Sequence, residues 1–369
     1  MNTRLTPSVA VKLLKTPMFR VFWGVFTLFF TLFFTGFSST LLFGSEEEEK
    51  VTRTAQESSA LVSVTSRASN NAVKYGLEWL VRHQLPDGSW SFNHSVADPT
   101  QCTCGNPGTY AECKNYATAL ALLPFIGCGM THEENEYHPH SYNEHIHAGL
   151  KFLLSSAEKV PNHPSGASLY QDEGAMYAHG LGTLCLTELY TMTKDESLCL
   201  PARSVKNYII YTQDPISGGW RYEIPREIPS ETEEDAITTS LQLITLRSAK
   251  IASLYVNPQC IAKGMNFLDS VQLDGGATYG YAKPGKDPTC TAIGLLCRMH
   301  YGWDRNNPAL VKGIEYLSDL GPNSDIFYNY YATQLLRHYG GEHWKKWHEK
   351  MRRQLITTQI KEEGHAKGS

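Results

Sequence analysis

The sequence lacks the features that define several protein classes. No run shows the sustained alternation of apolar and polar residues that is typical of strands, which favours an all-α fold. An excess of cations is also missing, because 33 Lys and Arg stand against 37 Asp and Glu. Phosphate backbones require clustered positive charge, so we expect no nucleic-acid partner. Glycine and proline, at 29 and 18 of 369 residues, are near average usage and exclude a collagen-like or linker-like chain.

Charged residues are also absent from one long apolar segment, residues 21–43. As a helix rising about 1.5 Å per residue, this segment is long enough to cross a ~30 Å hydrocarbon core. Residues 1–20 before it carry four cations and no acid, and Glu46–Glu49 follow it. The positive-inside rule therefore predicts a single-pass membrane anchor with residues 1–20 in the cytoplasm and the body outside. The alternative is a signal peptide cleaved near Ser45, which would make the protein secreted.

Two further regions follow the anchor. Residues 44–70 are polar, rich in Glu, Ser and Thr and free of aromatic residues, which predicts a flexible tether. Residues 71–369 contain the apolar and aromatic residues needed for a core, since 41% of the whole chain is hydrophobic. We expect this region to be the folded domain.

A repeated unit organises the folded domain. A small residue followed three positions later by an aromatic residue and then an aliphatic one marks a first helix, and a more apolar second helix follows after a Gly-rich break. The first helices begin their patterns at Gly76, Gly149, Val205, Gly264 and Gly313. The second helices are predicted near residues 116–127, 177–192, 236–254, 289–301 and 329–339. Five such hairpins would stack side by side, with the second helices forming an inner layer.

The first-helix pattern starts a sixth time near the C-terminus. Met351 begins it, Gln359 follows eight residues later, and Gly368 parallels Gly88 of the first copy. The chain stops where an aromatic residue and an inner helix would follow. We therefore predict a truncated sixth hairpin and an apolar seam between the first and fifth hairpins, through which the protein could self-associate.

The breaks carry a glutamine–tryptophan motif. The three copies are Gln84 to Trp90, Gln213 to Trp220, and Gln272 to Tyr279, where Tyr replaces Trp. These copies resemble the repeats of squalene-hopene cyclases, and residues 281–290 resemble a stretch of protein prenyltransferase β subunits. The resemblance covers residues 71–369 and implies an α/α toroid of the prenyltransferase and squalene-cyclase repeat family. We interpret the Gln and Trp residues as structural, with the amide bonding to helix-end groups and the ring packing on the next hairpin.

An acidic cluster precedes the third inner helix. Glu234 and Asp235 stand where the related terpene cyclases carry the acids that protonate an alkene. Neighbouring acids raise one another's pKa, which such a proton donor needs. Together with His179, they are the catalytic candidates. The alternative for Asp235 is a helix cap, since Asp is common at that position.

Other polar residues stand at the predicted starts of the inner helices. In a toroid these starts open onto one end of the central space, so they could contact a ligand. They are Tyr116, Tyr177, Thr239, Asp287, Tyr328, Asn329 and Tyr330.

Four of the nine cysteines fall in the first repeat, at positions 102, 104, 113 and 128. On the oxidising side of a membrane we expect a disulfide here, with a four-cysteine zinc site as the alternative. The zinc ligands of protein prenyltransferases are missing, because Ile237 and Pro288 stand where that family has Cys and His. We therefore predict no bound metal and no cofactor.

These patterns lead to one functional hypothesis and two alternatives. The resemblance implies an exported, membrane-tethered enzyme or binding protein that takes an isoprenoid or another apolar ligand. The first alternative is a non-catalytic interaction scaffold. The second is a lyase that acts on a glycan, with Arg221 or Arg226 as its base.

Overall fold

The fold is built from helices. The computed structural model describes residues 68–105, 108, 112–134, 142–161, 163, 165–224 and 233–369. Within these ranges, strands are limited to two antiparallel pairs of two residues per strand, so the all-α class is confirmed. None of the described helices is both long and apolar enough to span a membrane, and the proposed anchor at 21–43 lies outside the described residues.

The elements follow one another as helix pairs. The first described helix covers residues 68–82, so the folded region extends at least three residues into the predicted tether. The later helices are α4 (Lys114–Gly127), α5 (Asn143–Ser156), α6 (Ala175–Thr193), α7 (Glu196–Tyr211), α8 (Ala236–Ile251), α9 (Pro258–Ser270), α10 (Pro288–His300), α11 (Pro308–Leu320), α12 (Ile326–Tyr339) and α13 (Gly341–Thr358). The short elements are η1 (His94–Ala97), β1 (Glu158–Lys159), β2 (Ala167–Ser168), β3 (Gln272–Leu273), η2 (Asp274–Gly276) and β4 (Thr278–Tyr279).

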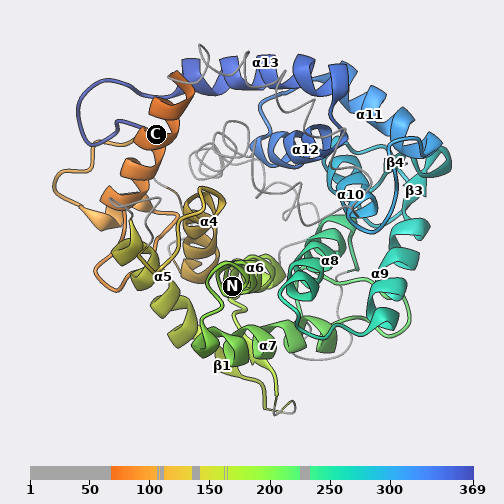
Figure 1. Cartoon of the computed structure of the whole chain (residues 1–369), viewed down its shortest axis with the longest axis horizontal. Coiled ribbons are helices and arrows are strands. Elements are labelled where there is room, and N and C mark those ends of the chain that lie inside the picture. Colours follow the sequence, from red (N-terminus) through yellow and green to blue (C-terminus); the bar gives the residue numbers. More distant parts are fainter. Residues whose placement is uncertain are drawn as a thin grey trace, which may run out of the picture.

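The helices form two concentric layers. Figure 1 shows α4, α6, α8, α10 and α12 on the inside, surrounded by the 68–82 helix and by α5, α7, α9, α11 and α13. Burial follows the layers: α4 is buried at every position from Asn115 to Ile126, whereas α5 buries only Ile146, Gly149, Leu150 and Leu153. The spacing of those four residues is that of one helix face, so α5 is amphipathic, whereas α4 is buried on every side. The predicted inner helices are confirmed.

The glutamine–tryptophan motif joins neighbouring outer helices. Gln84 Nε2 donates hydrogen bonds to the carbonyls of Gly88 and of His145 in α5, both at 2.9 Å. The fully buried Trp90 donates from Nε1 to the Leu80 carbonyl at 2.7 Å, and its ring packs on Gly149 of α5. The ring therefore packs on the next hairpin as expected, but the glutamine bonds to a first-turn carbonyl of the next helix and not to a helix-end group.

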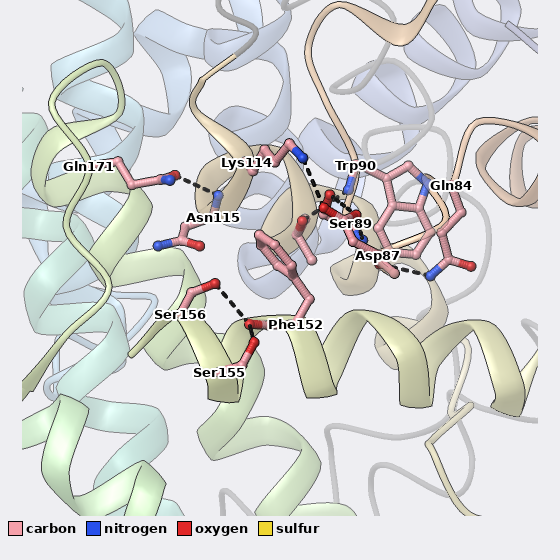
Figure 2. Close-up of polar contacts among 12 residues, drawn as sticks. Gln84, Asp87, Ser89, Trp90, Lys114, Asn115, Phe152, Ser155, Ser156 and Gln171 are labelled. Atoms are coloured by element: carbon pink, nitrogen blue, oxygen red, sulfur yellow. Dashed lines mark hydrogen bonds and ion pairs between the residues drawn. The ribbon is translucent and has the colours of Figure 1, made fainter. Parts of the chain in front are cut away.

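The same motif is also fastened to the inner layer. Figure 2 shows Gln84 and Trp90 close to Asp87, whose carboxylate pairs with Lys114 at the start of α4 at 2.9 Å. The Trp90 backbone N–H donates to the Thr118 hydroxyl of α4 at 3.0 Å. One turn of chain thus holds two outer helices and one inner helix together.

The second copy repeats these contacts. Gln213 Nε2 donates to the carbonyls of Gly218 at 2.7 Å and of Cys260, in α9, at 2.9 Å. Trp220 Nε1 donates to the Ile209 carbonyl at 2.7 Å, and its ring packs on Gly264 of α9. The repeated geometry explains why glycine stands at positions 149 and 264, since a side chain at either would collide with the Trp ring.

The C-terminal segment makes a further copy of the glutamine contacts. Gln359 Nε2 donates to the Gly368 carbonyl at 3.1 Å and to the Ala72 carbonyl of the 68–82 helix at 2.8 Å. Arg352 in α13 donates to the Ser69 hydroxyl at 2.9 Å. The predicted parallel between Gly368 and Gly88 is therefore confirmed.

These contacts show that the predicted open seam is wrong for the outer layer. There, α13 and residues 359–369 lie against the 68–82 helix, so described parts of the first and last repeats are joined (Figure 1). The physical reason is that the glutamine and glycine of the motif form their bonds without the aromatic residue that follows in the other copies. Self-association of the protein stays a prediction.

The motif glycine offers a direct test of this packing. Gly218 has φ +79°, and a Cβ atom there would lie 2.5 Å from the Lys263 carbonyl oxygen. We expect Gly218→Ala to lower the free energy of unfolding by roughly 3 kcal/mol, through left-handed strain and displacement of α9. Gly275 is the matched control, because its φ is +69° but no atom lies within 4 Å of its Cβ position. Gly275→Ala should cost only about 1 kcal/mol. Equal losses in urea titrations of the two variants would contradict the close approach.

Candidate functional site at the starts of the inner helices

The starts of the inner helices lie at one end of the ring. The Met176 N–H in α6 donates to the Tyr222 carbonyl before α8 at 3.0 Å. The Ala236 N–H in α8 likewise donates to the Tyr281 carbonyl before α10 at 2.8 Å. The starts of α6 and α8 are thus each covered by the loop that leads into the next inner helix. Side chains from these starts and loops therefore meet.

Aromatic rings meet at this end of the ring. The centroid of Tyr177 in α6 lies 6.2 Å from that of Tyr116 in α4 and 5.0 Å from that of Tyr222. Across the ring, Tyr177 stacks with Phe327 of α12 at 6.2 Å, and Phe327 contacts Tyr331 at 4.9 Å. All five side chains are buried, and we call them the aromatic cluster. The cluster connects α4, α6 and α12 through π contacts.

The hydroxyl of Tyr177 stands out within the aromatic cluster. It is buried and has no hydrogen-bond partner among the described residues. Burial raises the pKa of Tyr177 well above its ordinary value, and the nearby Asp235 carboxyl adds to the effect. Buried hydroxyls in proteins are normally hydrogen-bonded. The Tyr177 hydroxyl is therefore an exception among buried hydroxyls.

Asp235 lies at the start of α8 and caps it. Its carboxylate accepts from the Thr238 N–H and from the Thr238 hydroxyl, both at 2.7 Å, and from the hydroxyl of Tyr281. The side chain is completely buried. Burial raises the pKa of Asp235 to about 6, against the opposing effect of these hydrogen bonds. The acid therefore titrates near neutral pH, but its oxygens hold the helix start together.

The neighbouring Glu234 is part of an ion pair. Its Oε1 lies 2.5 Å from Nε of Arg221, and Arg221 also lies 3.6 Å from the Asp214 carboxylate. Two acids therefore hold the guanidinium that the glycan-lyase alternative would use as a base. The other base of that alternative, Arg226, lies outside the described residues.

His179 belongs to α6 and is completely buried. Its Nδ1 accepts from the Leu169 N–H at 3.0 Å, so Nε2 carries the proton and donates to the Val205 carbonyl of α7 at 3.1 Å. Complete burial lowers the pKa of His179 to about 3. Both ring nitrogens thus hold the backbone of two neighbouring segments, and the imidazole stays neutral.

Two of the predicted ligand residues bond to backbone N–H groups. Thr239 accepts from the Trp220 N–H at 3.0 Å, as Thr118 does in the first repeat. Asp287 caps α10 by accepting from the Cys290 N–H at 2.9 Å. The structure therefore gives both residues structural partners.

The three predicted residues of α12 behave differently from one another. The Tyr328 hydroxyl donates to the Gly321 carbonyl at 3.2 Å. The Asn329 amide exchanges hydrogen bonds with the backbone of Asn323 at 2.8 and 3.0 Å. Tyr330 is buried and packs against Tyr331 of the aromatic cluster. Of these three residues, only Tyr330 packs against the aromatic cluster, to which Tyr116 and Tyr177 belong.

The cysteines do not form the predicted set. All nine thiols are free, so the expected disulfide is wrong. Cys113 and Cys128 flank the two ends of α4, about 20 Å apart for a helix of this length, so a four-cysteine zinc site is wrong as well. Cys102 and Cys104 lie beside histidines, and this cluster is considered below.

Sequence reasoning missed aromatic residues that the repeat itself marks. Tyr222 and Tyr281 each stand two residues after the motif aromatic, at the same position as Phe92 in the first copy. Phe92 contacts Tyr116 with ring centroids 5.2 Å apart. In each copy of the motif, the residue two positions after the Trp or Tyr therefore lies at this end of the ring. Phe327 carries no comparable signal in the sequence.

Comparisons with known proteins add no assignment to this geometry. A scan against protein-family models found no matching family, and a search of curated proteins found no matching relative.

Proposed function

We propose that this chain is a membrane-tethered, extracytoplasmic α/α toroid of the prenyltransferase and squalene-cyclase type. We further propose that it binds an apolar ligand, such as an isoprenoid, at the aromatic cluster. The aromatic cluster is the observation that carries this proposal, because it brings rings from α4, α6 and α12 together at the starts of the inner helices. Buried rings offer a large apolar contact area and electron-rich faces.

Unpartnered polar atoms on α6 and α8 favour a ligand with a small polar head. The Tyr177 hydroxyl, the Ser240 hydroxyl and the Gln242 Oε1 atom are buried without a hydrogen-bond partner among the described residues. They belong to α6 and α8, which pack against each other. An isoprenoid alcohol or a similar amphiphile would place its chain against the rings and its oxygen near these groups.

Binding without catalysis accounts best for the acid and base candidates. Asp235 caps α8, Glu234 pairs with Arg221, and His179 holds two backbone groups. One observation favours a second candidate, acid catalysis by Asp235. Its carboxyl is buried beside Tyr281 with a pKa raised to about 6, so a fraction of it is protonated at neutral pH.

The test uses the full chain purified in detergent and a series of polyprenols as probes. We expect saturable binding, measured by quenching of tyrosine and tryptophan fluorescence. Tyr177→Leu should weaken it by about tenfold, which corresponds to about 1.4 kcal/mol of lost ring contact. The matched control is Tyr316→Leu on the outer helix α11, which should bind like the wild type. Circular dichroism confirms that both variants fold.

Two further variants separate the alternatives. Tyr177→Phe keeps the ring and should lose affinity only for polyprenols with a free hydroxyl. Asp235→Asn should bind as the wild type does. If the wild-type chain converts a bound polyprenol, loss of that conversion in Asp235→Asn would support acid catalysis. Failure of the wild-type chain to bind any polyprenol, while it pulls down glycans, would contradict the proposed ligand class.

A further inference from the structure

A cluster of metal-binding side chains lies away from the aromatic cluster, at the outside of the first repeat. His83 ends the turn after the 68–82 helix, Cys102 and Cys104 come from the loop before α4, and His365 comes from the C-terminal segment. One ligand atom from each of the four lies within 4.8 Å of all the others. His83 is buried and the other three side chains are half-buried.

We propose that His83, Cys102, Cys104 and His365 bind a zinc ion. Bond lengths of about 2.3 Å to sulfur and 2.0 Å to nitrogen place the ligand atoms of a tetrahedral zinc site about 3.5 Å apart. The Cys104 sulfur lies 3.4 Å from His83 Nε2 and 3.6 Å from His365 Nδ1. The Cys102 sulfur lies 3.7 Å from His83 Nε2. These separations match the edges of such a tetrahedron.

The surroundings hold His83 in the form that binds a metal. Its Nδ1 atom lies 2.7 Å from the Trp79 carbonyl oxygen. Because a carbonyl only accepts, Nδ1 carries the hydrogen and Nε2 presents its lone pair to the two sulfurs. Trp79 also stacks on the His83 ring at 4.0 Å and donates from Nε1 to the Cys104 sulfur at 3.4 Å. Outer hydrogen bonds of this kind are usual around metal ligands.

The donor set selects the metal. Two thiolates and two imidazoles in a tetrahedral arrangement are typical of structural zinc sites and unlike the oxygen-rich sites of calcium or magnesium. The four protein ligands complete the coordination, so the site is structural and leaves no position for a substrate.

The position of the fourth ligand gives the site its role. His365 lies in the segment in which Gln359 and Gly368 bond to each other and Gln359 bonds to Ala72. The ion would therefore fasten the C-terminal segment to the first repeat, next to the place where the outer layer is joined. We call this the zinc clasp. It also holds the loop that carries Cys102 and Cys104.

The first experiment measures zinc in the full chain purified in detergent under reducing conditions. We expect about one zinc ion per chain by elemental mass spectrometry. Cys104→Ser and His365→Asn should each weaken zinc binding by more than about 100-fold in competition with a chelator, because losing only an outer-shell partner costs about 10–100-fold. Cys199→Ser and His343→Asn are the matched controls, since both residues are partly buried outside the cluster. Both should bind zinc like the wild type.

The second experiment tests the fastening. Removing zinc with EDTA, or changing His365→Asn, should expose the C-terminal segment to trypsin after Lys361. His343→Asn should leave it protected. If removing zinc leaves this cleavage unchanged, the ion orders only the Cys102–Cys104 loop and does not fasten the C-terminal segment.

Three results would overturn the assignment. The first is wild-type protein without zinc after refolding in its presence. The second is a bond between Cys102 and Cys104, seen as a loss of two hydrogens in the mass of the unreduced protein. The third concerns His94, whose Nδ1 lies 3.9 Å from the Cys102 sulfur. If His94→Asn loses zinc and His365→Asn keeps it, the C-terminal segment is not a ligand.

Discussion

Replacing Trp220 with alanine should lower the free energy of unfolding by about 3–5 kcal/mol. The side chain is completely buried, its ring packs on Gly264 of the next outer helix, and its Nε1 donates to the Ile209 carbonyl at 2.7 Å. Alanine removes the ring and the hydrogen bond together, and the helices around the cavity cannot collapse onto it without disturbing the repeat. Chemical denaturation followed by circular dichroism measures the loss.

Two companion variants divide this effect. Trp220→Phe keeps most of the ring but removes the donor, so it should cost about 1–2 kcal/mol. Trp344→Ala, on the half-buried face of α13, should stay within about 1 kcal/mol of the wild type. If Trp344→Ala proved as costly as Trp220→Ala, the motif would have no special part in holding the repeats together.

Asp235→Asn should change the pH dependence of stability. Burial raises the pKa of Asp235 from 3.8 to about 6 in the folded protein. The stability linked to this group is therefore complete below about pH 4 and is lost as the pH rises through about 6. Asparagine keeps the cap without titrating. Relative to the wild type, the variant should gain about 2 kcal/mol between pH 4 and pH 7.

Asp214→Asn is the control of opposite sign. Partial burial of Asp214 raises its pKa, but hydrogen bonds from Ser217 and Ile216 and the charge of Arg221 outweigh it, so the pKa is lowered overall. Its contribution is present at neutral pH and lost in acid. The stability of the Asp214→Asn variant should therefore fall relative to that of the wild type as the pH rises through the acidic range. Parallel profiles for the two variants, measured by urea titration at each pH, would contradict the buried state of Asp235.

Local sequence patterns alone determined the helical class and the order of the repeats. Gly149 and Gly264 mark outer helices because a Trp ring from the preceding repeat packs directly on each. The inner helix α4 was predictable because its residues are mostly apolar, and all of them from Asn115 to Ile126 are buried. The copy at Gln359 and Gly368 was also recognisable, because its glycine fits under a neighbouring helix as Gly88 does.

Tertiary structure decided the partners of the polar side chains. Asp235, Asp287 and Thr239 looked alike in the sequence as polar residues at helix starts, and their hydrogen-bond partners became clear only in the folded chain. The aromatic cluster depends on the contact between Phe327 of α12 and Tyr177 of α6. Such contacts join residues far apart in sequence, for which no local spacing exists.

The proposed zinc ligands show the same division most clearly. Cys102 and Cys104 form a visible pair in the sequence, but their histidine partners do not, because His365 stands 261 residues beyond Cys104. A metal site depends on where ligand atoms lie in space, and only ring closure brings the C-terminal segment to the first repeat. The sequence by itself determined which helices form and how they repeat. The tertiary structure decided which side chains meet, because that depends on how the repeats curve back on one another.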